Sequence, residues 1–168
     1  MFSLTRARTD NPPRSGLVPK STGVANRRGA TLVETAIVLA VFLLLILGTV
    51  DLGLAVFRYN VLSEAARTGA RVASVHGALA PAAMGTWGPA TYSGTASDGS
   101  AYAQAVAPLL AGFTLSRVNI QVEWIDGGNA LQQRVRYTVS TTYRPIAVAF
   151  FTRSSYVHTA SSTMRISH

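Results

Sequence analysis

The sequence predicts an α+β fold in which a long N-terminal transmembrane helix extends into a small exported domain with an antiparallel β-sheet. No charge occurs from Thr35 to Val50, and the apolar segment continues to Phe57, which is long enough to cross a bilayer. The helical pattern then continues to Val75 without a proline. From Val118 onward, apolar and polar residues alternate as in half-buried strands. A helix that can cover one face of a following sheet is an α+β arrangement.

Residues 1–29 are expected to form a basic leader. Residues 1–26 mix Arg, Pro, Ser, Thr and Asn without apolar periodicity, which is typical of a disordered tail. The leader carries five Arg and one Lys against Asp10 alone. Because positive residues stay on the cytoplasmic side, we expect a cytoplasmic N-terminus, a single pass through a bacterial inner membrane and an exported, periplasmic remainder.

Residues 30–57 are predicted to form the transmembrane helix, about 42 Å long at ~1.5 Å per residue. Glu34 and Asp51 then lie towards opposite interfaces. Glu34 needs an explanation, because an unpaired carboxylate in a membrane span costs a few kcal/mol. One explanation is an interfacial acid near the positive helix end. The other is a cut after Gly29, which would give Ala30 a free ammonium about one turn from Glu34; pairing between neighbouring subunits would then set their stagger.

Residues 58–76 are predicted to extend the helix beyond the membrane, and His76-Gly77 predicts its end. Small residues recur at four-residue spacing, which permits close approach of another helix or a sheet. Charged side chains mark a solvated, salt-bridged face. The small residues are Ala65, Gly69 and Ala73, and the charged ones are Glu64, Arg67 and Arg71.

Residues 77–100 are rich in Gly, Ala, Pro, Ser and Thr, and predict a long surface loop that Trp87 and Tyr92 hold down. Residues 101–168 are expected to form the exported helix and sheet. A short helix is predicted over Ser100–Leu110, weakened in its last turn by Pro108. Three strands follow, whose predicted inner faces are Val118, Ile120, Val122 and Trp124; Val135, Tyr137, Val139 and Tyr143; and Tyr156, Ala160, Met164 and Ile166 within 155–166.

The stretch from Arg27 to His76 resembles the N-terminal segment of TadE-like proteins, which are minor pilins or pseudopilins of the tight-adherence (Flp, type IVb) pilus system. The Glu64–Arg71 motif is the part most specific to this family, because the hydropathy of a membrane helix alone does not require it. The matching elements are Gly29, Glu34, the apolar helix, Asp51-Leu52-Gly53 and Glu64-Ala65-Ala66-Arg67-Thr68-Gly69-Ala70-Arg71.

This resemblance implies processing by a prepilin peptidase between Gly29 and Ala30. It also implies a mature chain from Ala30 to His168 that stays in the inner membrane or enters a pilus, with a role in adhesion. The implied partners are other pilin or pseudopilin subunits, the inner-membrane assembly platform and membrane lipid. The residues expected to act in assembly are Glu34, Asp51, Glu64, Ala65, Ala66, Arg67, Gly69 and Arg71.

Other functions stay open at this point. An uncleaved single-pass protein could use its exported domain to recognise a ligand. A pseudopilin of a type II secretion system is a more similar alternative, but the Ala66–Arg71 motif argues against it. Gly53-Leu54-Ala55 mimics a signal peptidase site, but the helical pattern runs through it. Arg27-Arg28 alone does not make a twin-arginine signal.

The residue inventory predicts a non-enzymatic protein without metal or other cofactor. The absence of cysteine excludes disulfides, thiolate metal sites and cysteine nucleophiles. The histidines, His76, His158 and His168, lack ligand-like spacing, and no hydrolase or phosphate-loop motif occurs.

Two surface features could bind a partner. Arg134, Arg136 and Arg144 share an outer strand face that could meet phosphate; a solvated face that discourages edge aggregation is the favoured interpretation, so no nucleic acid is expected. The apolar run Ile146–Phe151 follows Pro145, and we expect a buried loop or short helix rather than an exposed docking patch.

Overall fold

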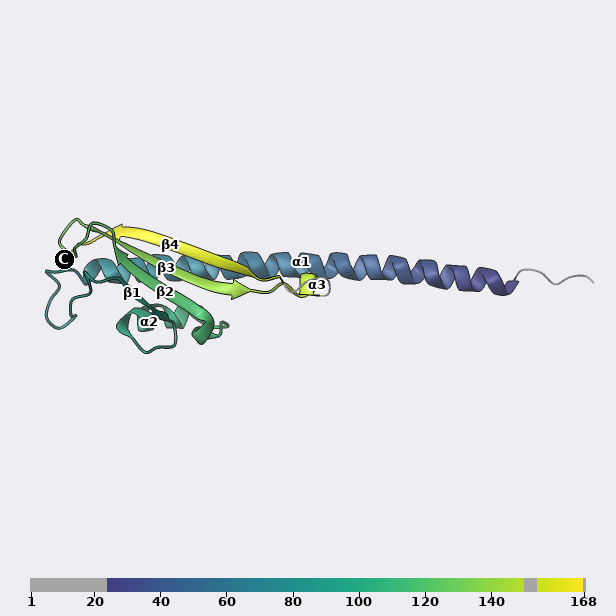
Figure 1. The fold of residues 1–168 in the computed structure, drawn as a ribbon, viewed down its shortest axis with the longest axis horizontal. Coiled ribbons are helices and arrows are strands. Elements are labelled where there is room, and N and C mark those ends of the chain that lie inside the picture. Colours follow the sequence, from purple (N-terminus) through teal and green to yellow (C-terminus); the bar gives the residue numbers. More distant parts are fainter. Residues whose placement is uncertain (1–23, 150–153, 168) are drawn as a thin grey trace, which may run out of the picture. The chain divides into compact units, whose positions relative to one another are not determined.

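The computed structural model describes residues 24–149 and 154–167, so most of the predicted leader lies outside the described part. The chain divides into two compact units, residues 1–40 and 41–168. One long helix precedes a four-stranded antiparallel sheet, which confirms the predicted α+β class (Figure 1).

Helix α1 runs from Val24 to Val75. It begins six residues before the predicted start at Ala30, since neither proline nor glycine interrupts the chain between Gly23 and Gly29. Its end agrees with the stop predicted at His76-Gly77. Large apolar side chains are exposed along it from Leu32 to Phe57. Among the described residues, α1 is the one helix long and apolar enough to span a membrane.

The sheet consists of β1 (Tyr92–Thr95), β2 (Val118–Trp124), β3 (Arg134–Tyr143) and β4 (Tyr156–Arg165), in that spatial order. Strand β1 corrects the prediction of an unbroken loop over 77–100. It pairs with β2 through Tyr92 opposite Val122 and Thr95 opposite Asn119. Four residues that include Gly94 give no readable alternation, so only the pairing with β2 reveals this strand.

The loop before β1 is held down as predicted. Trp87 is buried, its ring stacks on His76 with centroids 4.4 Å apart, and its backbone N–H donates to the His76 carbonyl at 2.7 Å. The Asn129 side chain donates to the Trp87 carbonyl at 2.9 Å. These contacts tie the loop to the end of α1 and to the β2–β3 turn.

The predicted helix over Ser100–Leu110 is confirmed as α2 (Ala101–Val106) followed by a 3₁₀ turn, η1 (Ala107–Leu110). Ser100 caps α2, because its hydroxyl accepts from the Ala103 N–H at 3.1 Å. Pro108 lies in η1 and tightens the end of the helix. Two further short helices are η2 (Leu115–Arg117) and α3 (Ile146–Ala149).

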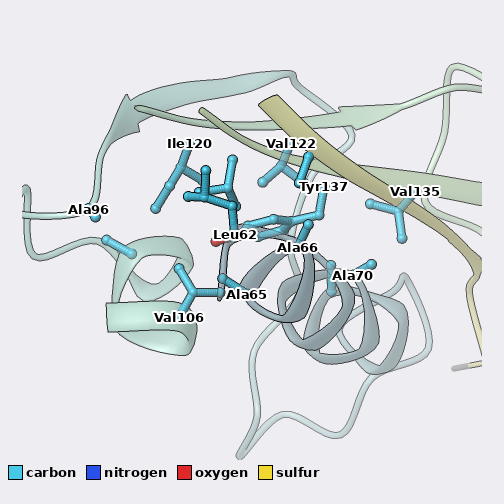
Figure 2. Close-up of a cluster of buried hydrophobic side chains, with 14 of the residues drawn as sticks. Leu62, Ala65, Ala66, Ala70, Ala96, Val106, Ile120, Val122, Val135 and Tyr137 are labelled. Atoms are coloured by element: carbon cyan, nitrogen blue, oxygen red, sulfur yellow. The ribbon is translucent and has the colours of Figure 1, made fainter. Parts of the chain in front are cut away.

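The core lies between α1, α2 and the inner face of the sheet (Figure 2). The predicted inner faces of β2 and β3 are buried, as are Ala160 and Ile166, while Met164 packs against the core. Tyr156 is the exception. It is 55% exposed, because it begins β4 opposite Tyr143, and Tyr143 takes the buried position beside α1.

Candidate functional site

The expected processing site lies in the first turns of α1, within residues 1–40. Gly29, Ala30 and Glu34 are exposed, and nothing lies within 4 Å of a Cβ built on Gly29. The Thr35 hydroxyl donates to the Thr31 carbonyl at 2.8 Å, so it satisfies itself within the helix. This segment is therefore open on its sides to a peptidase or to a neighbouring helix.

Asp51, predicted to act in assembly, makes contacts within the chain that the sequence did not predict. Only 7% of it is exposed, although it lies in an apolar stretch of α1. Its carboxylate accepts from the Ile146 N–H at 2.9 Å and from the Ala147 N–H at 2.5 Å. These are the first two amides of α3, which have no partner within that helix. Asp51 thus caps α3 from outside and ties the segment that follows β3 to α1.

Tyr143 completes this anchor. Its hydroxyl donates to the Asp51 carboxylate at 3.2 Å. Burial, together with the bond to that carboxylate, raises the pKa of Tyr143. The Arg58 guanidinium stacks over the same ring, 5.1 Å from its centroid, and over the Phe113 ring at 5.4 Å. The anchor is therefore enclosed by an aromatic ring and a cation.

An apolar groove of about 310 Å³ borders this anchor. His158 lies in its wall, with its ring centroid 5.4 Å from that of Tyr143, and its buried Nε2 has no hydrogen-bond partner among the residues that the structure describes. The single imidazole of His158 in an apolar wall does not by itself form a metal-binding site. The groove is lined by Gly48, Asp51, Leu52, Ala55, Tyr143, Pro145, Tyr156 and His158.

The small residues of the Glu64–Arg71 motif face the sheet of the same chain. Ala65, Ala66 and Gly69 are buried, and Tyr137 of β3 packs against this face (Figure 2). A Cβ built on Gly69 would lie 2.5 Å from the Tyr137 ring, and the Tyr137 hydroxyl donates to the Tyr102 carbonyl at 2.6 Å. The close approach to a sheet that the spacing predicted is therefore made within the domain, while a role in assembly stays a prediction.

The charged residues of the same motif lie on the opposite, solvated face of α1. Glu64 and Arg67 form an ion pair at 4.0 Å, with both side chains largely exposed. Arg71 is also exposed. An exposed pair of this kind contributes little to stability, so these side chains are available to partners.

The outer face of the sheet carries partly neutralised arginines. Arg134 donates to the Asp126 carboxylate at 2.6 Å, and Arg136 lies 3.7 Å from the Glu123 carboxylate. Hydrogen bonds from Arg134 lower the pKa of Asp126. Because the two arginines at this end each face an acid, the favoured interpretation of a solvated face agrees with the geometry.

Within the described part of the chain, no group of three or more His, Cys, Asp or Glu side chains could hold a metal ion. His76 is occupied by Trp87 and by the Gly85 carbonyl, which lies 2.8 Å from its Nδ1. His168 lies outside the described residues.

One comparison with known proteins bears on this site. Residues 29–71 match the family described as TadE-like protein. The chain carries a TadE-like segment. This confirms the expected resemblance, and the matched range includes both Gly29 and the Glu64–Arg71 motif. No curated protein and no solved structure matches the chain.

The TadE-like segment thus holds three separate features: the exposed start around Gly29 and Glu34, the Asp51 anchor, and the small-residue face packed on Tyr137. The sequence predicted processing at Gly29 and a role in assembly for Glu34, for Asp51 and for the small-residue face, but it did not predict the capping of α3 by Asp51. The only sequence signal for it was a carboxylate in an apolar helix, with a short apolar run after Pro145. Phe150 and Phe151 of that run lie outside the described residues, whereas Ala147 is buried and Ile146 is half exposed.

Proposed function

We propose that this chain is a non-enzymatic, minor pilin-like subunit of a tight-adherence (Flp, type IVb) pilus. The match of residues 29–71 to the TadE-like family is the observation that carries this proposal. Helix α1 would hold the subunit in the bacterial inner membrane, with the domain formed by the sheet and α2 on the periplasmic side.

The exposed apolar surface of α1 supports an assembly mechanism. Its side chains are exposed from Gly29 to Val50 with the exception of a half-buried Leu47, so an apolar surface is free to pack on lipid or on other pilin helices. A helix that leaves lipid for a filament keeps this surface buried, and the transfer does not expose it to water. The exported domain would then contact neighbouring subunits.

Cleavage by a prepilin peptidase between Gly29 and Ala30 is the first step of this mechanism. Coexpression with the peptidase is expected to give an intact mass that begins at Ala30. Gly29→Val should block that conversion, since a branched side chain would stand at the residue before the cut. Gly48→Ala, also on α1 with nothing within 4 Å, is the matched control. A mass beginning at Met1 would favour the uncleaved, membrane-anchored binding protein instead.

Glu34 is proposed to act in registry. After cleavage, the Ala30 ammonium and a neighbouring subunit's Glu34 carboxylate would neutralise each other in a low-dielectric setting. Glu34→Ala should reduce cross-linking between subunits while membrane insertion is unchanged, whereas Glu123→Ala on the exported sheet should not alter either. Equal cross-linking in Glu34→Ala and the parent chain would contradict a registry role.

A further inference from the structure

One end of the exported sheet lies beside the apolar part of α1. Asp51 binds the first amides of α3, and Tyr143 ends β3 at the same level. The exposed apolar surface of α1 continues past Asp51 to Val56 and Phe57. At ~1.5 Å per residue, Phe57 lies about 9 Å further along the helix. The anchored end of the sheet therefore sits at a height where α1 itself is still apolar.

Exposed apolar and aromatic side chains gather at this end of the sheet. Ile146 on α3 is 51% exposed, Tyr156 is 55% exposed and Val157 is 68% exposed. Tyrosine with an apolar neighbour is typical of the interface between lipid and water. Tyr156 and Leu52 of α1 both line the apolar groove beside Asp51, so this groove connects the end of the sheet to the apolar surface of α1.

Arginines stand at the same end on the outer face of the sheet. Arg117 precedes β2, Arg144 follows β3, and both line one depression with Thr142 and Ser155. Both are exposed, and no ion pair with a carboxylate is found for either within residues 24–149 and 154–167. This contrasts with Arg134 and Arg136 at the other end of β3, which each face an acid.

We propose that this end of the domain, the rim formed by Ile146, Tyr156, Val157, Arg117 and Arg144, rests on the periplasmic leaflet of the bilayer. The apolar side chains enter the interface and the two arginines bind lipid phosphates. The inference rests on the proposed membrane span of α1. Lipid is favoured over a second copy because the rim continues the lipid-exposed surface of α1 and adds two arginines that no described carboxylate pairs with, which suits them to phosphate. The Asp51 anchor fixes the rim at this depth.

The cysteine-free chain allows a depth measurement with single fluorescent probes. Val157→Cys and Thr163→Cys, each labelled with an environment-sensitive dye, occupy exposed positions of the same parity on β4. They are about 20 Å apart at ~3.3 Å per residue. In nanodiscs holding one full-length copy and lipids spin-labelled near the headgroup, the probe at residue 157 is expected to be blue-shifted and quenched. The probe at residue 163 should remain unquenched.

A third probe separates this inference from the proposed span. Leu45→Cys lies on the exposed apolar face of α1 and should be quenched by lipids labelled deep in the acyl chain. Quenching at residue 45 with equal, weak quenching at residues 157 and 163 overturns the rim alone. Lack of quenching at residue 45 overturns the span itself. Quenching at residue 157 that requires two copies per nanodisc would assign the rim to a second subunit and overturn lipid binding.

The arginine contribution is tested with lipid charge. The quenching at residue 157 should fall when phosphatidylglycerol is replaced by phosphatidylcholine, and in phosphatidylglycerol it should fall for the double variant Arg117→Gln with Arg144→Gln. Arg165→Gln, at the opposite end of β4, is the matched control. The same quenching in both lipids and in the double variant would contradict phosphate binding.

Discussion

Replacing Gly69 with alanine tests whether the small residues of the Glu64–Arg71 motif serve to pack α1 against the sheet. A Cβ at this position would lie 2.5 Å from the Tyr137 ring, and ordinary contact begins at 3.4 Å, so the ring would have to move by about 0.9 Å. Tyr137 is fully buried and its hydroxyl is bound to the Tyr102 carbonyl, which leaves little room for that movement. Overpacking of this kind costs roughly 1–3 kcal/mol.

Helix propensity works in the opposite direction. Alanine in place of glycine inside a helix gains about 0.5–1 kcal/mol. We therefore expect Gly69→Ala to lower the free energy of unfolding by about 1–2 kcal/mol. Gly48→Ala on the same helix, where nothing lies within 4 Å, should be neutral or slightly stabilising.

Urea unfolding of the full chain in detergent micelles measures this difference. Both tryptophans, Trp87 and Trp124, lie in the core between α1, α2 and the sheet, so their fluorescence reports on that core. Combining Gly69→Ala with Tyr137→Leu should remove most of the cost, because the ring is gone. A Gly69→Ala chain as stable as the Gly48→Ala chain would refute the packing argument.

Three further predictions concern single contacts. Asp51→Ala should leave the Ile146 and Ala147 amides without their acceptor and speed their hydrogen exchange, with little change in tryptophan-reported unfolding; unchanged exchange would contradict the anchor. Ser100→Ala should cost about 1 kcal/mol in the same urea assay through loss of the α2 cap, and a loss within error of zero would count against it. Because bonds from Arg134 lower the pKa of Asp126 in the folded chain, that carboxylate stabilises the domain above its ordinary pKa of 3.8 and loses this effect as pH falls through the lowered folded value. Asp126→Asn should therefore flatten the acid limb of the stability–pH curve, and an unaltered limb would exclude this pair as its source.

The sequence predicted the elements that have a strong period. An uninterrupted apolar helix and three alternating strands specify their own inner faces, because burial repeats every 3.6 or every two residues. Strand β1 escaped prediction, since a four-residue strand with a glycine has no period of its own. Tyr156 had the correct parity but lies at the sheet's end, beyond the cover that makes parity equivalent to burial.

The site divides in the same way. The Gly29–Glu34 spacing and the Glu64–Arg71 motif both lie within one helix and depend only on local sequence. The sequence by itself therefore determined the TadE-like segment and its exposed start. The partner of Asp51 lies 95 and 96 residues away on α3, and the partner of Gly69 is Tyr137 on β3. Only the tertiary structure decided these pairings, because hydrogen bonds and ring contacts across the fold depend on how the sheet docks on α1. The sequence shows that the Asp51 carboxylate in an apolar helix requires a hydrogen-bond partner, and the tertiary structure identifies that partner as the start of α3.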